Sequence, residues 1–125
     1  MTYAFANATV PKVNVIIGAA YGSAYVAMNS KAIGADVTFA WPTAEIGMMD
    51  AKSAARIMYP DADAATLNEK AAEYAKLQSG VASAARHGYV DTIIEAQDTR
   101  KYVIGALEML FTKREDRPAK KHGTV

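Results

Sequence analysis

The sequence predicts an α/β fold with too few strands for a complete sheet. Residues 13–18 are rich in valine and isoleucine, and residues 36–41 alternate apolar with polar side chains, as β-strands do. Apolar residues recur at helical spacing in the second half of the chain. At 125 residues, 51% hydrophobic and 22% charged, the chain has the length and composition of one folded domain.

The chain is expected to begin with a helix and a buried strand. Residues 1–9 favour the helix, and Pro11 ends it because the residue before a proline avoids helical geometry. The strand at 13–18 is short, β-branched and bounded by Pro11 and Gly18. Such a segment is typical of a strand buried on both faces.

A turn and a second helix follow this strand. Gly22 marks a tight turn, residues 23–31 are expected to form the helix, and Gly34 ends it. No charged residue occurs from 13 to 30. The strand and the helix are therefore expected to be buried on nearly all sides, which is more burial than a domain of this size usually achieves without partners.

The middle of the chain is expected to hold a second strand and two helices. The strand at 36–41 is closed by Pro42, and Asp50 is placed to cap a short helix at 51–58. Thr66, with Glu three residues later, fits a capping box that opens a longer helix. That helix is expected to reach Arg86, weakened by Gly80 and ended by Gly88, with a packing stripe formed by Tyr74, Leu77 and Val81.

The last elements are a short extended segment at 90–95 and an amphipathic helix that Asp98 is expected to cap. Residues 113–125 are polar and basic, and we expect a solvated, irregular tail there. The buried face of the last helix is expected to contain Val103, Ala106, Leu107, Leu110 and Phe111.

Composition excludes several classes of function. The 14 basic and 13 acidic side chains give a net charge of +1, without the broad basic surface that nucleic-acid binding needs. There is no cysteine, and therefore no disulfide, thiolate metal site or cysteine nucleophile. His87 and His122 are too far apart to form a metal-binding motif, and His87 is expected to have a structural role. We expect no metal and a cytoplasmic setting.

One segment has the ingredients of a binding site made of backbone groups. A buried strand leads through Gly22, Ser23 and Ala24 into a helix, whose first N–H groups lack partners within the helix. Small residues let a ligand oxygen approach those donors, as in an oxyanion hole. The pattern alone also fits a simpler interpretation, in which the small residues let the helix pack closely on the strand.

Nine stretches, spread over essentially the whole chain, resemble the biotin-dependent acyl-CoA carboxyltransferases. That family includes the β subunit of propionyl-CoA carboxylase and the carboxyltransferase subunits of methylmalonyl-CoA and glutaconyl-CoA decarboxylases. The most specific stretch is AWPTAEIG at 40–47. The others are ATVPK at 8–12, AYGSAYVAM at 20–28, SK at 30–31, GAD at 34–36, DTRK at 98–101, ALEML at 106–110, KRE at 113–115 and KKHG at 120–123.

The resemblance implies a crotonase-like ββα superhelix. Residues 1–112 resemble the later half of the family's C-terminal carboxyltransferase domain, and residues 113–125 its basic C-terminal tail. In that family the N-terminal domain holds the acyl-CoA and the C-terminal domain holds biotin, at an interface between subunits of a hexamer. The chain should therefore carry biotin-side groups and lack the acyl-CoA-side donors.

The resemblance also implies roles for individual residues. The biotin oxyanion donors fall on the backbone N–H groups of Ser23 and Ala24. The family usually has glycine in place of Ser23, and a serine can still donate its N–H if the turn does not require a positive φ. Tyr21, Gly22 and Tyr25 are expected to bind biotin beside the donors, Val26 to set the acyl-chain size, and Trp41, Pro42 and Glu45 to serve the scaffold.

The implied function is transfer of a carboxyl group between biotin on a carrier protein and a short-chain acyl-CoA, such as propionyl-, methylmalonyl-, glutaconyl-, acetyl- or malonyl-CoA. The implied partners are an N-terminal carboxyltransferase part, a biotin carboxyl carrier protein and further subunits of a hexamer-like oligomer. A membrane would be involved only indirectly, through a decarboxylase complex. Two alternatives stay open: a crotonase-type hydratase or isomerase fragment with Glu45 as its acid, and a non-catalytic assembly remnant.

Overall fold

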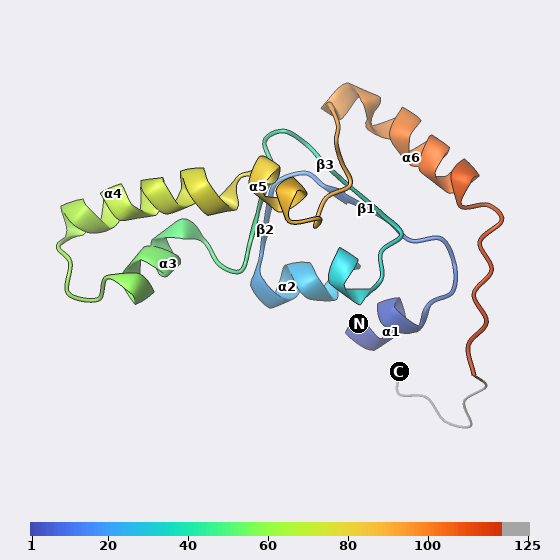
Figure 1. The fold of residues 1–125 in the computed structure, drawn as a ribbon, viewed down its shortest axis with the longest axis horizontal. Helices are drawn as coiled ribbons and strands as arrows, with labels where there is room; N and C mark the ends of the chain where they lie inside the picture. The colour runs from blue at the N-terminus through green and yellow to red at the C-terminus, as the bar shows by residue number, and fades with distance from the viewer. Residues whose placement is uncertain (119–125) are drawn as a thin grey trace.

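The computed structural model describes residues 1–118 and has a three-stranded parallel sheet at its centre (Figure 1). The strands β1 (Val13–Ile16), β3 (Val37–Ala40) and β5 (Thr92–Ile93) lie in the order β1-β3-β5. All neighbours run parallel. The two strands predicted from β-branched and alternating residues are confirmed, as is the short extended segment within 90–95.

A second, two-stranded parallel sheet was not predicted. It pairs β2 (Ala19–Tyr21) with β4 (Glu45–Gly47), so that Ala19 lies opposite Glu45. Each strand has three residues, which is too short to show a period of two in the sequence. This pairing brings the segment before Gly22 against a segment from the middle of the chain.

The second predicted helix is shorter than expected. Helix α2 spans Gly22–Ala27, and the prediction that it continues to residue 31 is wrong. Asn29, with a φ of 56°, leaves helical geometry, and a separate turn of 3-10 helix follows at Lys31–Ile33. Gly34, with a φ of 98°, ends that turn. No residue of α2 is buried in this chain, so the expected burial of this helix on nearly all sides is also wrong here.

Helices α3 (Ala51–Met58) and α4 (Ala64–Tyr74) form an antiparallel hairpin that extends away from the sheet (Figure 1). The carboxylate of Asp50 accepts hydrogen bonds from the first turn of α3, so the predicted cap is confirmed. The chain then passes through a π-helical turn, Ala75–Ser79, into α5 (Val81–Arg86).

The predicted start of the longer helix is wrong. Asp63, and not Thr66, is the N-cap of α4: its carboxylate accepts the N–H of Thr66 at 3.3 Å. The prediction of one continuous helix to Arg86 is wrong as well, because the π turn and the extended backbone at Gly80 separate α4 from α5. Gly88, with a φ of 80°, follows α5 as expected.

The sheet separates two apolar clusters, because successive side chains of β3 point to opposite faces. Ala40 belongs to the cluster that α5 covers, and Phe39 to the cluster that α6 covers. The first cluster contains Ile16, Ala40, Ala44, Ile46, Val81, Ala84 and Val90; the second contains Phe39, Ile94 and Ala106, with Val13, Val15, Val37 and Trp41 packed on it. Leu77 is 63% exposed, so the predicted stripe is wrong at this residue.

Helix α6 (Thr99–Met109) crosses one face of the sheet and is anchored by Trp41. The indole N–H donates to Thr99 Oγ1 at 2.9 Å, which supports the expected packing role of this tryptophan. Asp98 occupies the N-cap position of α6, as predicted, but its side chain makes no cap hydrogen bond there. The predicted buried face holds only in part: Ala106 is buried, Val103 and Leu110 are half-buried, and Leu107 and Phe111 are exposed.

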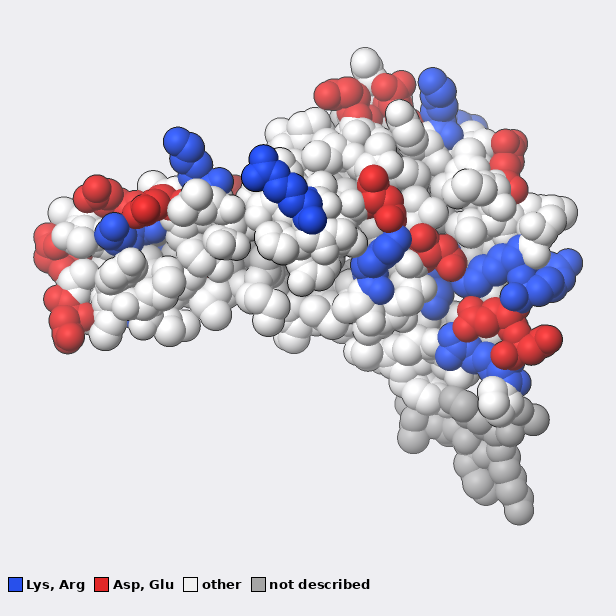
Figure 2. Space-filling model, viewed as in Figure 1, with Lys and Arg blue, Asp and Glu red and all other residues white. Residues whose placement is uncertain are grey.

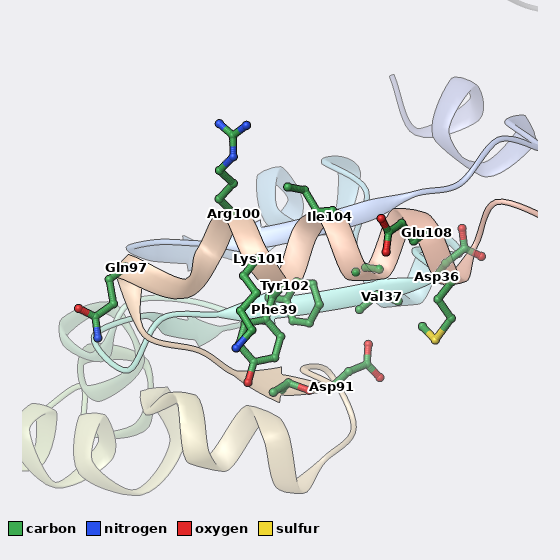
Figure 3. Close-up of a pocket in the computed structure, with 14 residues that line it drawn as sticks. Asp36, Val37, Phe39, Asp91, Gln97, Arg100, Lys101, Tyr102, Ile104 and Glu108 are labelled. Atoms are coloured by element: carbon green, nitrogen blue, oxygen red, sulfur yellow. The ribbon is translucent and has the colours of Figure 1, made fainter.

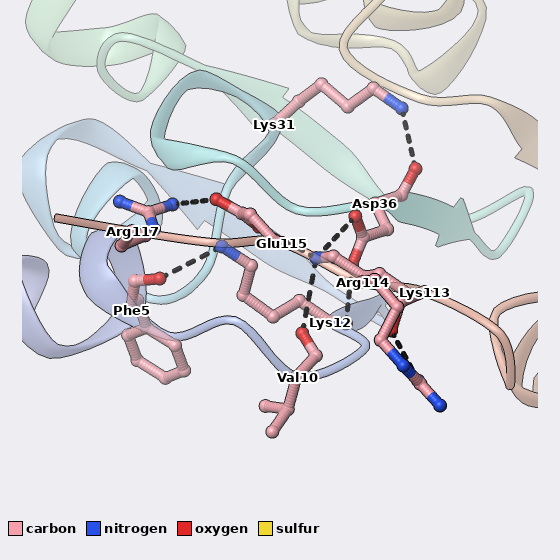
Figure 4. A network of polar contacts seen from close by, with 9 residues as sticks. All are labelled: Phe5, Val10, Lys12, Lys31, Asp36, Lys113, Arg114, Glu115 and Arg117. Atoms are coloured by element: carbon pink, nitrogen blue, oxygen red, sulfur yellow. Dashed lines mark hydrogen bonds and ion pairs between the residues drawn. The ribbon is translucent and has the colours of Figure 1, made fainter.

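An ionic cluster joins the start of the chain to the segment after α6 (Figure 4). Lys113 Nζ lies 2.9 Å from both carboxylate oxygens of Asp36, and the backbone N–H of Lys12 donates to the same carboxylate at 2.7 Å. The Lys12 side chain is buried and donates to the carbonyl of Phe5 in α1 (Thr2–Asn7) at 3.0 Å. The Lys113 side chain is thus mostly buried, unlike the solvated tail predicted from this residue on. Residues 114–118 have no regular structure and are mostly exposed, as predicted, and residues 119–125 lie outside the described residues.

A second carboxylate, Asp91, ties β5 to the rest of the sheet. It accepts the backbone N–H of Thr38 at 2.8 Å and the Nζ of Lys31 at 2.6 Å. Burial alone would raise the pKa values of Asp36 and Asp91, but their lysine and backbone N–H partners outweigh it, and both pKa values lie below the ordinary 3.8. Both carboxylates therefore stabilise the fold only while they are ionised.

The Asp36 cluster predicts a pH dependence of stability. Because the pKa of Asp36 is lower in the folded than in the unfolded chain, its contribution is complete well above the unfolded-state pKa of 3.8 and is lost as the pH falls through the lower folded-state pKa. Replacing Asp36→Asn should lower the free energy of unfolding at pH 7 by about 2 kcal/mol and flatten its fall in acid. Urea unfolding followed by circular dichroism at pH 7 and pH 3 measures both, with the exposed Glu73→Gln as control. Equal acid sensitivity in Asp36→Asn and the unmodified protein would contradict the assignment.

The Trp41 hydrogen bond predicts a second effect. Replacing Thr99→Val removes the acceptor and leaves the half-buried indole N–H unpaired, which should cost about 1 kcal/mol. Thr99→Ser keeps the hydroxyl and should stay close to the unmodified protein. Trp41 is the only tryptophan in the sequence, so its fluorescence reports unfolding and the local change directly. Equal unfolding midpoints for the valine and serine variants would refute this role.

Candidate functional site

The predicted backbone donors lie where β2 runs directly into α2. Gly22, between them, has a φ of 64°, and a Cβ at this position would lie 3.2 Å from the carbonyl oxygen of Met48. A side chain here would be strained in the backbone and crowded in space. Glycine is therefore required for the turn to place Ser23 and Ala24 in the first turn of the helix.

The first turn of α2 is open. Ser23 and Ala24 are exposed, and the N-cap residue Tyr21 offers no side-chain bond to the turn. Among residues 1–118 the only residue other than glycine with a positive φ is Asn29, so the turn makes no such demand on Ser23. The serine can present its N–H as a glycine would. The chain thus presents first-turn N–H groups, without a side-chain cap, at an exposed surface of small residues.

The side chain of Tyr21 is hydrogen-bonded to a residue of another strand. Its hydroxyl donates to Glu45 Oε2, which the β2–β4 pairing brings close from 24 residues further along the chain. Burial, followed by the hydrogen bond to Glu45 and the charge of Glu45, raises the pKa of Tyr21 to about 12; the nearby Ser79 hydroxyl acts in the opposite direction. The phenol is therefore a neutral hydrogen-bond donor at neutral pH.

Tyr25 and Val26 lie one turn further along α2. Tyr25 packs against the apolar cluster under α5, and its hydroxyl is buried without a hydrogen-bond partner among the described residues. Burial, and then the proximity of Tyr89, raises the pKa of this phenol. Val26 is half-buried, and its carbonyl accepts the hydroxyl of Ser30 at 2.9 Å.

The structure thus gathers the predicted segment 21–26 on one strand-to-helix junction, and it adds two residues that the sequence did not associate with it. Glu45 was expected to serve the scaffold, and its link to Tyr21 was missed. Ser79 was not singled out at all, although it is buried within the π turn. Neither neighbour leaves a sequence signal, because Glu45 comes to Tyr21 through the unpredicted β2–β4 sheet and Ser79 through the bridge between Glu45 and Gly80.

A separate groove lies on the face of the three-stranded sheet that α6 covers, away from the strand-to-helix junction. It has a cavity volume of about 1090 Å³ and runs along β3 and β5. In Figure 3, Phe39 and Tyr102 form its floor, with ring centroids 5.6 Å apart, while Arg100 points away from the sheet. None of the residues of the strand-to-helix junction lines this groove.

Charge is distributed unevenly over the surface. In Figure 2, acidic and basic side chains gather on the α3–α4 hairpin, around α6 and near the segment after it, and single charged side chains stand out on the surface between the hairpin and the rest. Within residues 1–118 no group of three or more acidic or histidine side chains could hold a metal ion. None of the helices in this described part is long and apolar enough to cross a bilayer.

Comparison with known proteins gives close relatives in sequence. The model of the carboxyl transferase domain family matches residues 1–125. The chain is 51% identical over 131 residues to a putative propionyl-CoA carboxylase beta chain of Bacillus subtilis, covering 100% of this chain and 26% of that protein. It is 48% identical over 129 residues to the methylmalonyl-CoA decarboxylase subunit alpha of Propionigenium modestum, covering 98% of this chain and 25% of that protein. The chain thus spans about a quarter of the length of these relatives.

Solved structures give the same result for the fold. A transcarboxylase 12S, crystallised as a hexamer assembly with methylmalonyl-coenzyme A and methylmalonic acid bound, is 45% identical and superposes with a TM-score of 0.92. The match covers 98% of this chain and 24% of that one. The beta subunit of a geranyl-CoA carboxylase from P. aeruginosa shares the fold, with a TM-score of 0.76. The expected α/β crotonase-like fold is confirmed, and the chain belongs to the carboxyl transferase domain family.

Proposed function

We propose that this chain is the biotin-side part of a carboxyltransferase subunit, which transfers a carboxyl group between biotin and a short-chain acyl-CoA. The observation that carries the proposal is the match, over nearly the whole chain, to a transcarboxylase 12S at a TM-score of 0.92 and 45% identity. The open first turn of α2 supports it, since it offers backbone donors where the family resemblance places them.

The residues at the junction fit biotin. Exposed small residues leave the N–H groups of Ser23 and Ala24 accessible to a ligand oxygen, and no charged side chain belongs to the segment. When bound, biotin supplies the ureido group that carries the carboxyl group. The two backbone N–H groups stabilise negative charge on the ureido oxygen, and the turn at Gly22 holds them in place without further reorganisation. Tyr21 and Tyr25 border the site as neutral phenols.

The acyl-CoA is proposed to be short. The relatives at 45–51% identity are named for propionyl-CoA and methylmalonyl-CoA. Val26, half-buried on α2, is proposed to limit the acyl chain. The direction, carboxylation or decarboxylation, depends on the partner reaction, because backbone donors stabilise the same charge in both.

The chain is proposed to act with partners. It spans about a quarter of its relatives, α2 has no buried residue, and the groove beneath α6 is open. These uncovered surfaces suit an N-terminal acyl-CoA-binding part, further subunits of a hexamer and a biotin carboxyl carrier protein, in a cytoplasmic assembly. The alternative of a hydratase fragment with Glu45 as its acid is less favoured, because that carboxylate already accepts the hydroxyl of Tyr21.

The first test is the native assembly. We expect this chain to copurify with an acyl-CoA-binding part and a biotinylated protein, and the assembly to exchange carboxyl groups between methylmalonyl-CoA and biotin. Native mass spectrometry and carboxyl transfer from ¹⁴C-labelled methylmalonyl-CoA measure these two properties. A lone monomer without biotin-dependent transfer would refute the proposal; an assembly that forms but shows no transfer would identify a non-catalytic remnant.

A substitution at the turn tests the donors directly. Gly22→Ala places a Cβ against the Met48 carbonyl at a positive φ and should shift the N–H groups of Ser23 and Ala24. Loss of one such donor costs about 3 kcal/mol, so carboxyl transfer in the assembly should fall at least a hundredfold. Gly105→Ala is the matched control, because its Cβ meets no atom within 4 Å and its φ is not positive. Equal rates for the two variants would contradict the assignment.

A further inference from the structure

We propose that Glu45 is a positioning residue for the backbone donors of Ser23 and Ala24, and that it acts through the hydroxyl of Tyr21. Its carboxylate accepts that hydroxyl, and Tyr21 is the last residue of β2 before the turn. The inference rests on the proposed carboxyl transfer, and it gives a role in that reaction to a residue outside the junction.

The junction needs a second support because the strand that carries it is short. Strand β2 has three residues, and among residues 1–118 its only sheet partner is β4, also three residues long. The first residue after β2 is Gly22, which has the widest conformational freedom of any residue. A bond at the side chain of Tyr21 therefore restrains the point from which the turn starts.

Glu45 is itself fixed at its backbone. Its N–H donates to the carbonyl of Gly18 at 3.2 Å, and it pairs with Ala19 in the parallel sheet. On its other side it forms an antiparallel bridge with Gly80, between the π turn and α5. Ile46, the next residue, is buried in the apolar cluster. The carboxylate thus extends from a backbone held by residues 18–19 on one side and by Gly80 on the other, next to a buried side chain.

Tyr21 and Glu45 form a charge-assisted hydrogen bond at the surface, where Glu45 is exposed. A phenol bonded to a carboxylate is a charge-assisted donor, which is stronger than a bond between neutral groups. The raised pKa keeps the proton on Tyr21 throughout the neutral range. Ser79, 2% exposed in the π turn, lies near the phenol, but its buried hydroxyl makes no hydrogen bond with the described residues. The restraint on Tyr21 therefore comes from Glu45.

The pair predicts a specific kinetic effect. Its loss should allow the turn at Gly22 to move, so that Ser23 and Ala24 N–H groups align less well with the charge that develops on biotin. Binding of the coenzyme A part should be unaffected, because the groups proposed to hold it lie in another part of the assembly and only Val26, further along α2, is proposed to border the acyl group. The loss should therefore appear in kcat and in the KM for biotin, and not in the KM for the acyl-CoA.

The test uses the native assembly, with free biotin and methylmalonyl-CoA as substrates. Glu45→Ala and Tyr21→Phe should each lower kcat about tenfold, and the double variant should lower it no further, since both remove the same bond. Glu45→Gln keeps an acceptor oxygen and should restore most of the rate. Glu73→Ala, which removes an exposed carboxylate bonded to Lys70 on α4, is the matched control and should have no effect.

A second measurement does not depend on turnover. The Ala24 methyl group, labelled with ¹³C in the assembly, should lose order in Glu45→Ala and Tyr21→Phe, while the methyl group of Ala106, buried on the inner face of α6, should not change. Unchanged order of the Ala24 methyl group in the two single variants would overturn the inference. Additive losses of kcat in the double variant would overturn it too. So would a rise in the KM for methylmalonyl-CoA together with a lower unfolding midpoint, because that result indicates general destabilisation. If the unmodified assembly transfers no carboxyl group, the proposed function fails, and the methyl measurement alone decides whether Glu45 positions the turn.

Discussion

Strand β3 is the element on which the other contacts depend. It pairs with β1 on one side and β5 on the other, and its alternating side chains enter the two apolar clusters. The residues at its ends hold the periphery: Asp36, just before it, binds Lys113, and Trp41, just after it, anchors α6 through Thr99. This four-residue strand therefore contacts a neighbouring strand on each side and an apolar cluster on each face. The residues that flank it hold the last helix and the segment after it.

The sequence predicted those features of the fold that depend on local chemistry. Gly34 and Gly88 end helical segments with a positive φ, as glycine at a helix end usually does, and Asp50 caps α3. The prediction failed where two residues could fill the same position. Asp63 and Thr66 are both suitable N-caps, and the sequence pattern does not show at which of them the helix begins. The interruption of the long helix failed similarly, since glycine at position 80 weakens a helix without requiring that it end.

At the candidate site, the segment could be predicted and its supports could not. Small residues between a strand and a helix mark a junction in the sequence alone. The contact of Tyr21 with Glu45 requires two three-residue strands to pair across 24 residues, and no local pattern encodes that pairing. The uncharged stretch predicted that helix α2 is buried, but such a stretch does not show whether this chain or another one buries the helix. Its exposure here and its apolar sequence agree once the chain is seen as a quarter of its relatives.

The left-handed geometry of the junction is confined to one residue. Since Gly22 is the residue of the junction with a positive φ, residue 23 needs only the ordinary helical backbone, which any residue with a side chain can adopt. The serine side chain can therefore change in evolution without rebuilding the backbone that presents the proposed donors. The backbone geometry thus depends on Gly22, while the side chain one residue later can be changed to alter what borders the proposed ligand without moving the donors.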